Sequence, residues 1–222
     1  MFMKSKSNFI LGGMSGLLTA LLIALVRKVD VASIGPKGTS IGLSHLNQMV
    51  HQSVGVHDIW YKITELLGGV ALLVVGIFAL VGFVQLLQRK SLVKVDQEIY
   101  ALGGLYAVML VLYAVFEKVV INYRPVVMAG ETAPEASFPS SHTMLTCVVM
   151  GSAMMILHQY IKSEGLQKIL QVVCGLILVV TVVGRLVSGV HWFTDIVGGV
   201  LISITLLSIF AGVVKCLDQE RE

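Results

Sequence analysis

Residues 176–207 read LILVVTVV GRLVSGVHWFTD IVGGVLISITLL, two strongly apolar runs joined by a short segment with an arginine, a histidine and an aspartate. Each run continues to a length that suits a membrane-spanning helix, which takes about 20 residues. Ionisable residues are costly in a membrane and are functional by default. Arg185, His191 and Asp195 therefore mark the junction of two membrane helices as a candidate site.

The rest of the chain has the same apolar character. Of its 222 residues, 56% are hydrophobic and 13% are charged, whereas an ordinary soluble domain has about 25% charged residues. Six apolar segments are long enough to cross a bilayer, and they lack the alternation of barrel strands. They cover about residues 9–26, 63–87, 99–121, 143–161, 168–188 and 193–214. We therefore expect an all-α polytopic membrane protein with six transmembrane helices, and we treat residues 1–222 as one domain.

Two segments near the N-terminus need separate interpretation. The first apolar run resembles a signal peptide in position, but no small-residue cleavage site follows it, so we expect a retained helix. Residues 27–62 are more polar, and within them GLSHLNQMVHQ (42–52) is predicted as a short interfacial helix between the first and second spans. Its apolar face is predicted to contain Leu43, Leu46, Met49 and Val50.

Other site classes have little support in the sequence. The three cysteines form no CxxC pair, which argues against a disulfide framework or a zinc site. His45, His51 and His57 recur every six residues, and with Asp58 they leave a metal site open beside the interpretation as solvated interfacial histidines. The net charge of +3 is mild, and no basic stretch is interleaved with aromatic residues. We expect no nucleic-acid partner, no metal, no cofactor and no obligate protein partner.

The orientation follows from the loop lysines and arginines, which favour the cytoplasmic side. With the N-terminus inside, nine of them lie on the inner side and seven on the outer side. We therefore expect a plasma-membrane protein with both termini in the cytoplasm. Residues 122–142 and 185–195 then lie on the extracytoplasmic side.

Residues 138–144, FPSSHTM, begin the predicted fourth helix. Pro139 fixes the backbone before the helix, and Ser140 or Ser141 can cap it. The free N–H groups of a helix N-terminus attract anions, so His142 would lie beside a phosphate-binding position. A plain serine cap with an interfacial histidine is the alternative interpretation.

Residues 184–195 and 117–125 complete the set on the same side of the membrane. His191 and Asp195 are four residues apart and share a face if they lie on one helix, so the carboxylate can fix the imidazole tautomer. Arg185 offers a planar fork that matches phosphate oxygens. Arg124 ends an apolar helix and is held at its rim by Pro125. An interfacial ion pair and membrane-anchoring arginines are the alternatives.

Taken together, the three clusters resemble the three signature motifs of the type-2 phosphatidic acid phosphatase family, the membrane lipid phosphate phosphatases, in its bacterial branch. The family pattern is Lys-x6-Arg-Pro, Pro-Ser-x-His and Ser-Arg-x5-His-x3-Asp. The resemblance covers about residues 59–214. The matching positions are Arg124, Pro125, Pro139, Ser140, His142, Arg185, His191 and Asp195.

The resemblance implies a metal-independent phosphatase with a covalent phosphohistidine. It implies His191 as the nucleophile, His142 as the general acid and base, and Asp195 as the residue that orients His191. Arg124, Arg185, Ser140 and Ser141 would bind the phosphate. The implied partner is a lipid phosphate in the bilayer, with undecaprenyl diphosphate favoured and phosphatidylglycerophosphate or phosphatidic acid as alternatives. A non-catalytic lipid-binding or transport protein on the same scaffold is the alternative of another class.

Two positions depart from the family pattern. Gly184 stands in place of the serine, and Glu117 in place of the lysine, with Lys118 one position away. Glu117 lies about two helical turns before Arg124 and faces the same way. We expect it to pair with Arg124 or Arg185 and hold it. Protonation near substrate, contact with a substrate hydroxyl, or a local unwinding that brings Lys118 inward are the alternatives.

Overall fold

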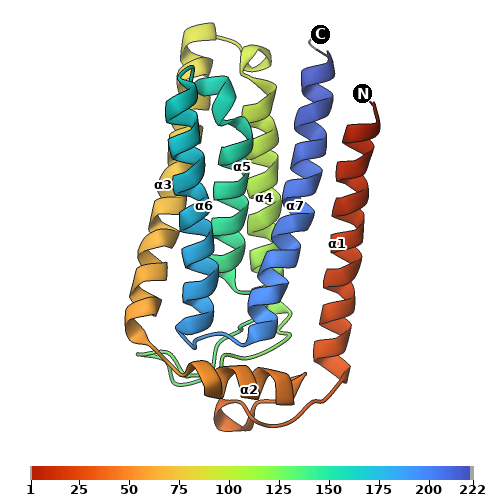
Figure 1. Ribbon diagram of the computed structural model, residues 1–222, viewed down its shortest axis with the longest axis vertical. Helices are drawn as coiled ribbons and strands as arrows, with labels where there is room; N and C mark the ends of the chain where they lie inside the picture. Colours follow the sequence, from red (N-terminus) through yellow and green to blue (C-terminus); the bar gives the residue numbers. More distant parts are fainter. Residues whose placement is uncertain (1, 221–222) are drawn as a thin grey trace.

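The computed structural model describes residues 2–220, which form a bundle of six long helices closed at one end by a short one (Figure 1). The long helices are α1 (Phe2–Lys28), α3 (Asp58–Arg89), α4 (Gln97–Lys118), α5 (Ser141–Tyr160), α6 (Glu164–Val187) and α7 (Phe193–Glu220). The short helix α2 (Ser44–Val54) crosses the end of the bundle opposite to the two chain termini (Figure 1). Single 3-10 turns lie at Pro36–Gly38 and Leu92–Lys94.

All six long helices are long and apolar enough to span a bilayer. Their outer faces carry exposed large side chains such as Leu17 and Leu66, which are at least 70% exposed and suit contact with lipid. The predicted fold class is confirmed, and the protein is a multi-pass membrane protein. The predicted helix ends were less accurate: α3 begins at Asp58 instead of residue 63, and α4 ends at Lys118 instead of residue 121.

Helix α5 lies at the centre of the bundle and packs against α3, α6 and α7. Its side chains at Val148, Val149, Met150 and Ile156 are completely buried. In the most apolar stretch of α5, 61% of the residues are buried. The value is 22% in α1, α3, α4 and α6, which face lipid over most of their surface. The first turn of α5 is therefore placed in the middle of the bundle end that α2 covers.

The predicted short helix is present as α2, and its polar face packs against the rest of the protein. Leu43 precedes the helix in a left-handed conformation, and Met49 is 61% exposed. The buried residues are Ser44 and Asn47, because the neighbouring element is the polar N-terminus of α7. There Asn47 accepts a hydrogen bond from the Thr194 backbone N–H at 3.1 Å and donates to the Thr194 hydroxyl at 3.0 Å. Of the predicted apolar face, Leu46 and Met49 are exposed and Leu43 lies just before the helix.

Candidate functional site

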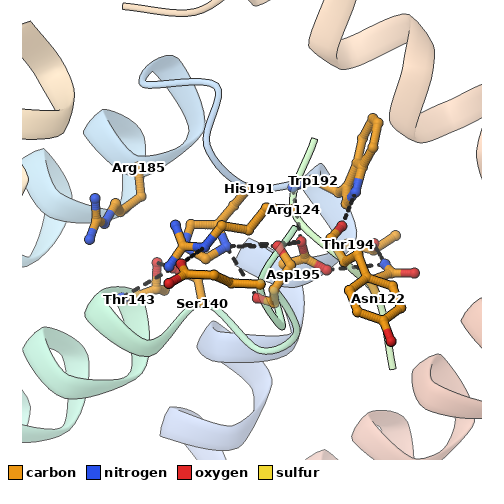
Figure 2. A network of polar contacts seen from close by, with 12 residues as sticks. Asn122, Arg124, Ser140, Thr143, Arg185, His191, Trp192, Thr194 and Asp195 are labelled. Carbon is orange, nitrogen blue, oxygen red and sulfur yellow. Dashed lines mark hydrogen bonds and ion pairs between the residues drawn. The ribbon is translucent and has the colours of Figure 1, made fainter. Parts of the chain in front are cut away.

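The three sequence clusters meet at the end of the bundle under α2. Arg185 lies in the last turn of α6, His142 in the first turn of α5, His191 just before α7, and Asp195 in the first turn of α7. Arg124 reaches the same place from the connection between α4 and α5. Figure 2 shows Arg124, Arg185, His191 and Asp195 gathered between the helix ends, with Arg124 beside His191.

His191 is held by a serine hydroxyl that also contacts Asp195. The Ser137 hydroxyl lies 3.0 Å from Nδ1 of His191 and donates to Oδ2 of Asp195 at 2.5 Å. The direct distance from His191 Nδ1 to Asp195 Oδ2 is 4.0 Å. The two residues do share a side as predicted, but His191 precedes α7 and its contact with the carboxylate runs through Ser137.

Asp195 has a second task, which is to cap α7. It is the third residue of the helix, and its Oδ2 accepts the Trp192 backbone N–H at 2.9 Å, as in a capping box. Its Oδ1 accepts from Nδ2 of Asn122 at 3.1 Å. With the bond from Ser137, the completely buried carboxylate is held by three donors. Such contacts keep a buried carboxylate in place.

Ser137 and Asn122 are brought together by a short antiparallel contact within the connection between α4 and α5. The Ser137 backbone N–H donates to the Asn122 carbonyl at 2.9 Å, and that of Arg124 donates to the Glu135 carbonyl at 3.0 Å. Tyr123 and Ala136 form the bridge between these pairs. Sequence reasoning missed Ser137 and Asn122, because neither belongs to a motif and their contacts cross more than 50 positions.

The segment that carries His191 is fixed from the other side by the region around α2. Gly189 has a φ of +69°, and a Cβ there would lie 2.2 Å from the Gly55 carbonyl oxygen. The Gly189 carbonyl contacts Nε2 of His51 at 3.1 Å, and the Ser188 carbonyl accepts the His57 backbone N–H at 3.2 Å. Two of the three histidines considered for a metal site thus support this loop.

The remaining histidine, His45, lies 2.7 Å from Asp30 and its side chain is 92% exposed. Within the described residues, no group of three or more histidine, cysteine, aspartate and glutamate side chains is arranged to hold a metal ion. The histidines spaced by six residues therefore do not form a shared centre.

Ser140 and Ser141 have different roles. Ser140 is completely buried and caps α5, because its hydroxyl accepts from the Thr143 hydroxyl at 3.0 Å and from the Thr143 backbone N–H at 3.5 Å. Its own N–H donates to the Asp195 carbonyl at 3.0 Å, which ties the start of α5 to α7. Ser141 lines the cavities described below. The Ser140 hydroxyl, predicted to bind phosphate, is thus engaged in the cap, and Ser141 is the serine of this motif that borders the cavities.

Arg185 and Arg124 each pair with a carboxylate other than the predicted Glu117. Nη2 of Arg185 lies 2.6 Å from Oε1 of Glu65, and Nε of Arg124 lies 3.1 Å from Oε2 of Glu135. Among the ion pairs of residues 2–220, Glu117 takes no part. It lies beside Arg124 in a cavity wall, so the prediction that it holds an arginine is wrong. Two other carboxylates already occupy those partners.

Lys118 is exposed and does not line that cavity, so the local unwinding that would bring it inward is absent. Glu65 was missed by the sequence reasoning, although a signal existed. It lies within the predicted second span, and an acidic residue inside an apolar segment is a functional candidate by default.

Several buried nitrogen atoms of the site have no hydrogen-bond partner among the described residues. They are Nε and Nη1 of Arg185, Nδ1 of His142, Nε2 of His191 and Nε of Arg124, which contacts Glu135 as an ion pair but without hydrogen-bond geometry. Buried polar groups are normally paired, so a cluster of unpaired ones at one place indicates a ligand position. Most of these groups are donors, which fits an oxygen-rich anion.

His191 lies outside the membrane-spanning helices and is 3% exposed. Burial lowers the pKa of His191 well below its usual value, and the positive charges of Arg124 and Arg185 lower it further. The imidazole is therefore neutral at pH 7, with Nδ1 engaged by Ser137 and Nε2 unpaired. This is the protonation state that a nucleophilic histidine needs.

Two neighbouring cavities meet at the site. The smaller is lined by Arg124, Ser137, Glu117 and His191. The larger, about 450 Å³, has Glu65 and His142 in its wall and is otherwise mostly apolar, with residues of α3, α4 and α5. Tyr113, Ser141 and Met144 line both. A polar chamber thus adjoins an apolar one, an arrangement that suits an amphiphilic ligand.

Comparisons with known proteins bear on the family and the fold of this chain. A family model described as the PAP2 superfamily matches residues 98–215, just over half of the 222 residues. A solved structure, described as the first transmembrane PAP2-type phosphatidylglycerolphosphate phosphatase from Bacillus subtilis, has the same fold. It is similar over 96% of this chain and 98% of that chain, with a TM-score of 0.65 and 19% sequence identity. No curated protein sequence matches.

Proposed function

The chain belongs to the PAP2 superfamily, and from this premise we propose that it is a membrane lipid phosphate phosphatase with a phosphohistidine intermediate on His191. The observation that carries the proposal is the neutral imidazole of His191, whose Nε2 is buried and unpaired beside two guanidinium groups. A free lone pair next to cations is the arrangement for attack on a phosphoryl group.

In the first step, Nε2 of His191 attacks phosphorus as the bond to the leaving oxygen breaks. His142 gives a proton to that oxygen, which leaves as the lipid alcohol or lipid monophosphate. Asp195 stabilises the positive charge that develops on His191, acting through the Ser137 hydroxyl.

In the second step, His142 takes a proton from water, and the water oxygen attacks phosphorus. The bond from phosphorus to Nε2 breaks, inorganic phosphate leaves, and His191 returns to its neutral form. One histidine thus acts first as acid and then as base.

Arg124 and Arg185 supply the positive charge that phosphoryl transfer requires on the equatorial oxygens. Nε and Nη1 of Arg185 are buried and unpaired, and Arg124 lies beside His191 (Figure 2). The backbone N–H groups of the first turn of α5, at Ser141 and His142, add further donors. With these groups in place, we propose that the reaction proceeds without a metal ion.

The lipid character of the substrate is supported by the larger cavity. Gly68, Leu72, Met109, Leu110 and Leu145 make its wall apolar, while Glu65 and His142 lie at its polar part. A chain of methylene groups among α3, α4 and α5 would leave its phosphate beside His142. This supports a lipid phosphate over a soluble phosphate ester.

For the substrate itself, undecaprenyl diphosphate is our first proposal, on the basis of an extracytoplasmic site. The site lies at the bundle end opposite to both termini (Figure 1), and we propose that the termini are cytoplasmic. Phosphatidylglycerophosphate is the second candidate, because the similar solved structure is described as a phosphatase of that lipid. Phosphatidic acid is the third.

The test is phosphate release by purified protein in lipid nanodiscs from each of the three lipids. We expect release from at least one lipid, unchanged activity with EDTA, and loss of activity in His191→Ala. His45→Ala is the matched control, because His45 is exposed and lies outside the site. Release that persists in His191→Ala removes the nucleophile assignment, and no release from any lipid favours a lipid-binding or transport protein.

A further inference from the structure

A carboxylate from outside the family-matched region contacts two groups of the site. Oε1 of Glu65 lies 2.6 Å from Nη2 of Arg185 and 3.1 Å from Nε2 of His142. Glu65 belongs to α3, and the family match begins at residue 98. The motifs therefore do not predict this partner of both the proton-transfer residue and a phosphate-binding residue.

Glu65 is part of a stripe on one face of α3. Tyr61, four residues earlier, places its ring 5.1 Å from Cζ of Arg185. Gly68, three residues later, leaves room for the His142 ring, because a Cβ there would lie 2.7 Å from its Cδ2. Residues at this spacing share one helix face. The Tyr61 ring and the Glu65 carboxylate thus contact Arg185, while Glu65 and the space beside Gly68 accommodate the His142 ring.

We propose that Glu65 is a positioning residue of this site, which orients His142 for proton transfer and Arg185 for phosphate binding. The proposal rests on the proposed function. A carboxylate on Nε2 determines which ring nitrogen carries the proton, as second-shell carboxylates do for other functional histidines. On Arg185 it holds Nη2, while Nε and Nη1 remain unpaired for the phosphate oxygens.

The charged groups around His142 make the Glu65 carboxylate important for this histidine. The titratable and charged side chains that face His142 come from α3, α4, α6 and the connecting segments. They are Glu65, Tyr113, Arg185, Arg124 and His191. Glu65 is the carboxylate in this set, and the other members are cations or neutral groups. It therefore stabilises the imidazolium form of His142 against two arginines.

The test compares Glu65→Gln and Glu65→Asp with Asp58→Asn in phosphate-release kinetics. Asp58 lies on the same helix but forms an exposed pair with Lys62, so it is a matched carboxylate-to-amide control. We expect kcat at least about tenfold lower in Glu65→Gln, with KM within about threefold. The alkaline limb of its pH profile should move to lower pH, because an amide does not stabilise the imidazolium. Glu65→Asp should recover part of kcat, and Asp58→Asn should match the wild type.

Two results would overturn the proposal. One is an unchanged kcat and pH profile in Glu65→Gln. The other is a higher kcat with tighter inhibition by inorganic phosphate, which would make Glu65 a competitor for the phosphate position. If wild-type protein releases no phosphate, the proposed function fails separately, and thermal stabilisation by orthovanadate then tests Glu65. Weaker stabilisation of Glu65→Gln than of Asp58→Asn supports the positioning role, and equal stabilisation contradicts it.

Discussion

The two histidines of the site are held in different ways. His191 is almost fully buried, and a hydroxyl separates it from its carboxylate, which three donors fix in place. The side chain of His142 is 24% exposed and touches the half-exposed Glu65 directly. The first arrangement is dry and rigid, and the second opens onto a cavity.

The difference fits the two chemical tasks of the proposed mechanism. A nucleophile has to be neutral and fixed in line with phosphorus, which burial and a rigid support achieve. A residue that exchanges protons with a leaving group and with water must remain reachable. In this molecule α7 and the connection between α4 and α5 build the first half, while α3 and α5 build the second.

The strongest way to break the nucleophile half is Asp195→Asn. The amide cannot accept all three donors as the carboxylate does, and it no longer stabilises the charge on His191. We expect activity to fall about a thousandfold or more and the thermal midpoint to drop, with a loss of about 2–3 kcal/mol in unfolding free energy. Phosphate release and thermal unfolding in detergent measure the two effects. Wild-type activity in this variant would mean that His191 needs no carboxylate.

Ser137→Ala separates the bridge from the carboxylate itself. The remaining distance of 4.0 Å between Nδ1 and Oδ2 is too long for a hydrogen bond. We expect kcat to fall about 10- to 100-fold with little change in KM, because the link from His191 to Asp195 is lost while the contact of Nδ1 with the Ser137 carbonyl at 3.1 Å remains. Steady-state kinetics test this. A kcat equal to the wild type would show that the bridge has no catalytic role.

The acid–base half can be disturbed by a single methyl group. A Cβ at Gly68 would meet the His142 ring, whereas a Cβ at Gly69 has nothing within 4 Å. We expect Gly68→Ala to lower kcat about tenfold by displacing His142, and Gly69→Ala to leave it unchanged. Both variants add one methyl group, at neighbouring positions of α3. Equal activities would contradict the close fit of His142 against α3.

The burial of His191 also predicts a pH dependence of stability. Its pKa in the folded protein is held below the unfolded value of about 6.5. Below that pH the unfolded chain takes up a proton that the folded protein does not, so stability falls as the pH falls. The slope is up to about 1.4 kcal/mol per pH unit. Thermal midpoints between pH 7.5 and 5 should fall less steeply in His191→Gln, and parallel curves would contradict a neutral, buried His191.

The smallest effect is expected at Lys118. The lysine of the family pattern would stand one position earlier, where this chain has Glu117. Because Lys118 is exposed outside the cavity wall, Lys118→Ala should keep activity within about twofold of the wild type. Arg124→Ala, measured beside it, should lose most activity. A large loss in Lys118→Ala would mean that this lysine moves into the site with substrate.

The sequence predicted the fold well, because span length and apolarity are local properties that the bilayer demands of each helix. It also predicted which motif residues would meet, since the six-helix order places their segments at one end. Ser137 and Asn122 were beyond it, because each acts through a tertiary contact with a residue far along the chain. The carboxylate partners of the arginines could not be predicted from spacing, because α4 ends at Lys118 and leaves Arg124 and Glu135 in the connection between α4 and α5.

The contact of Asn47 and His51 with Gly189 and Thr194 has a consequence for how the protein is made. Residues 42–57 are synthesised and can be placed at the membrane surface long before the segment they hold leaves the ribosome. The loop that carries His191 can therefore contact these residues only after α6 has been synthesised. The proposed site is complete only when α7 has also been made, because Asp195 lies in that helix.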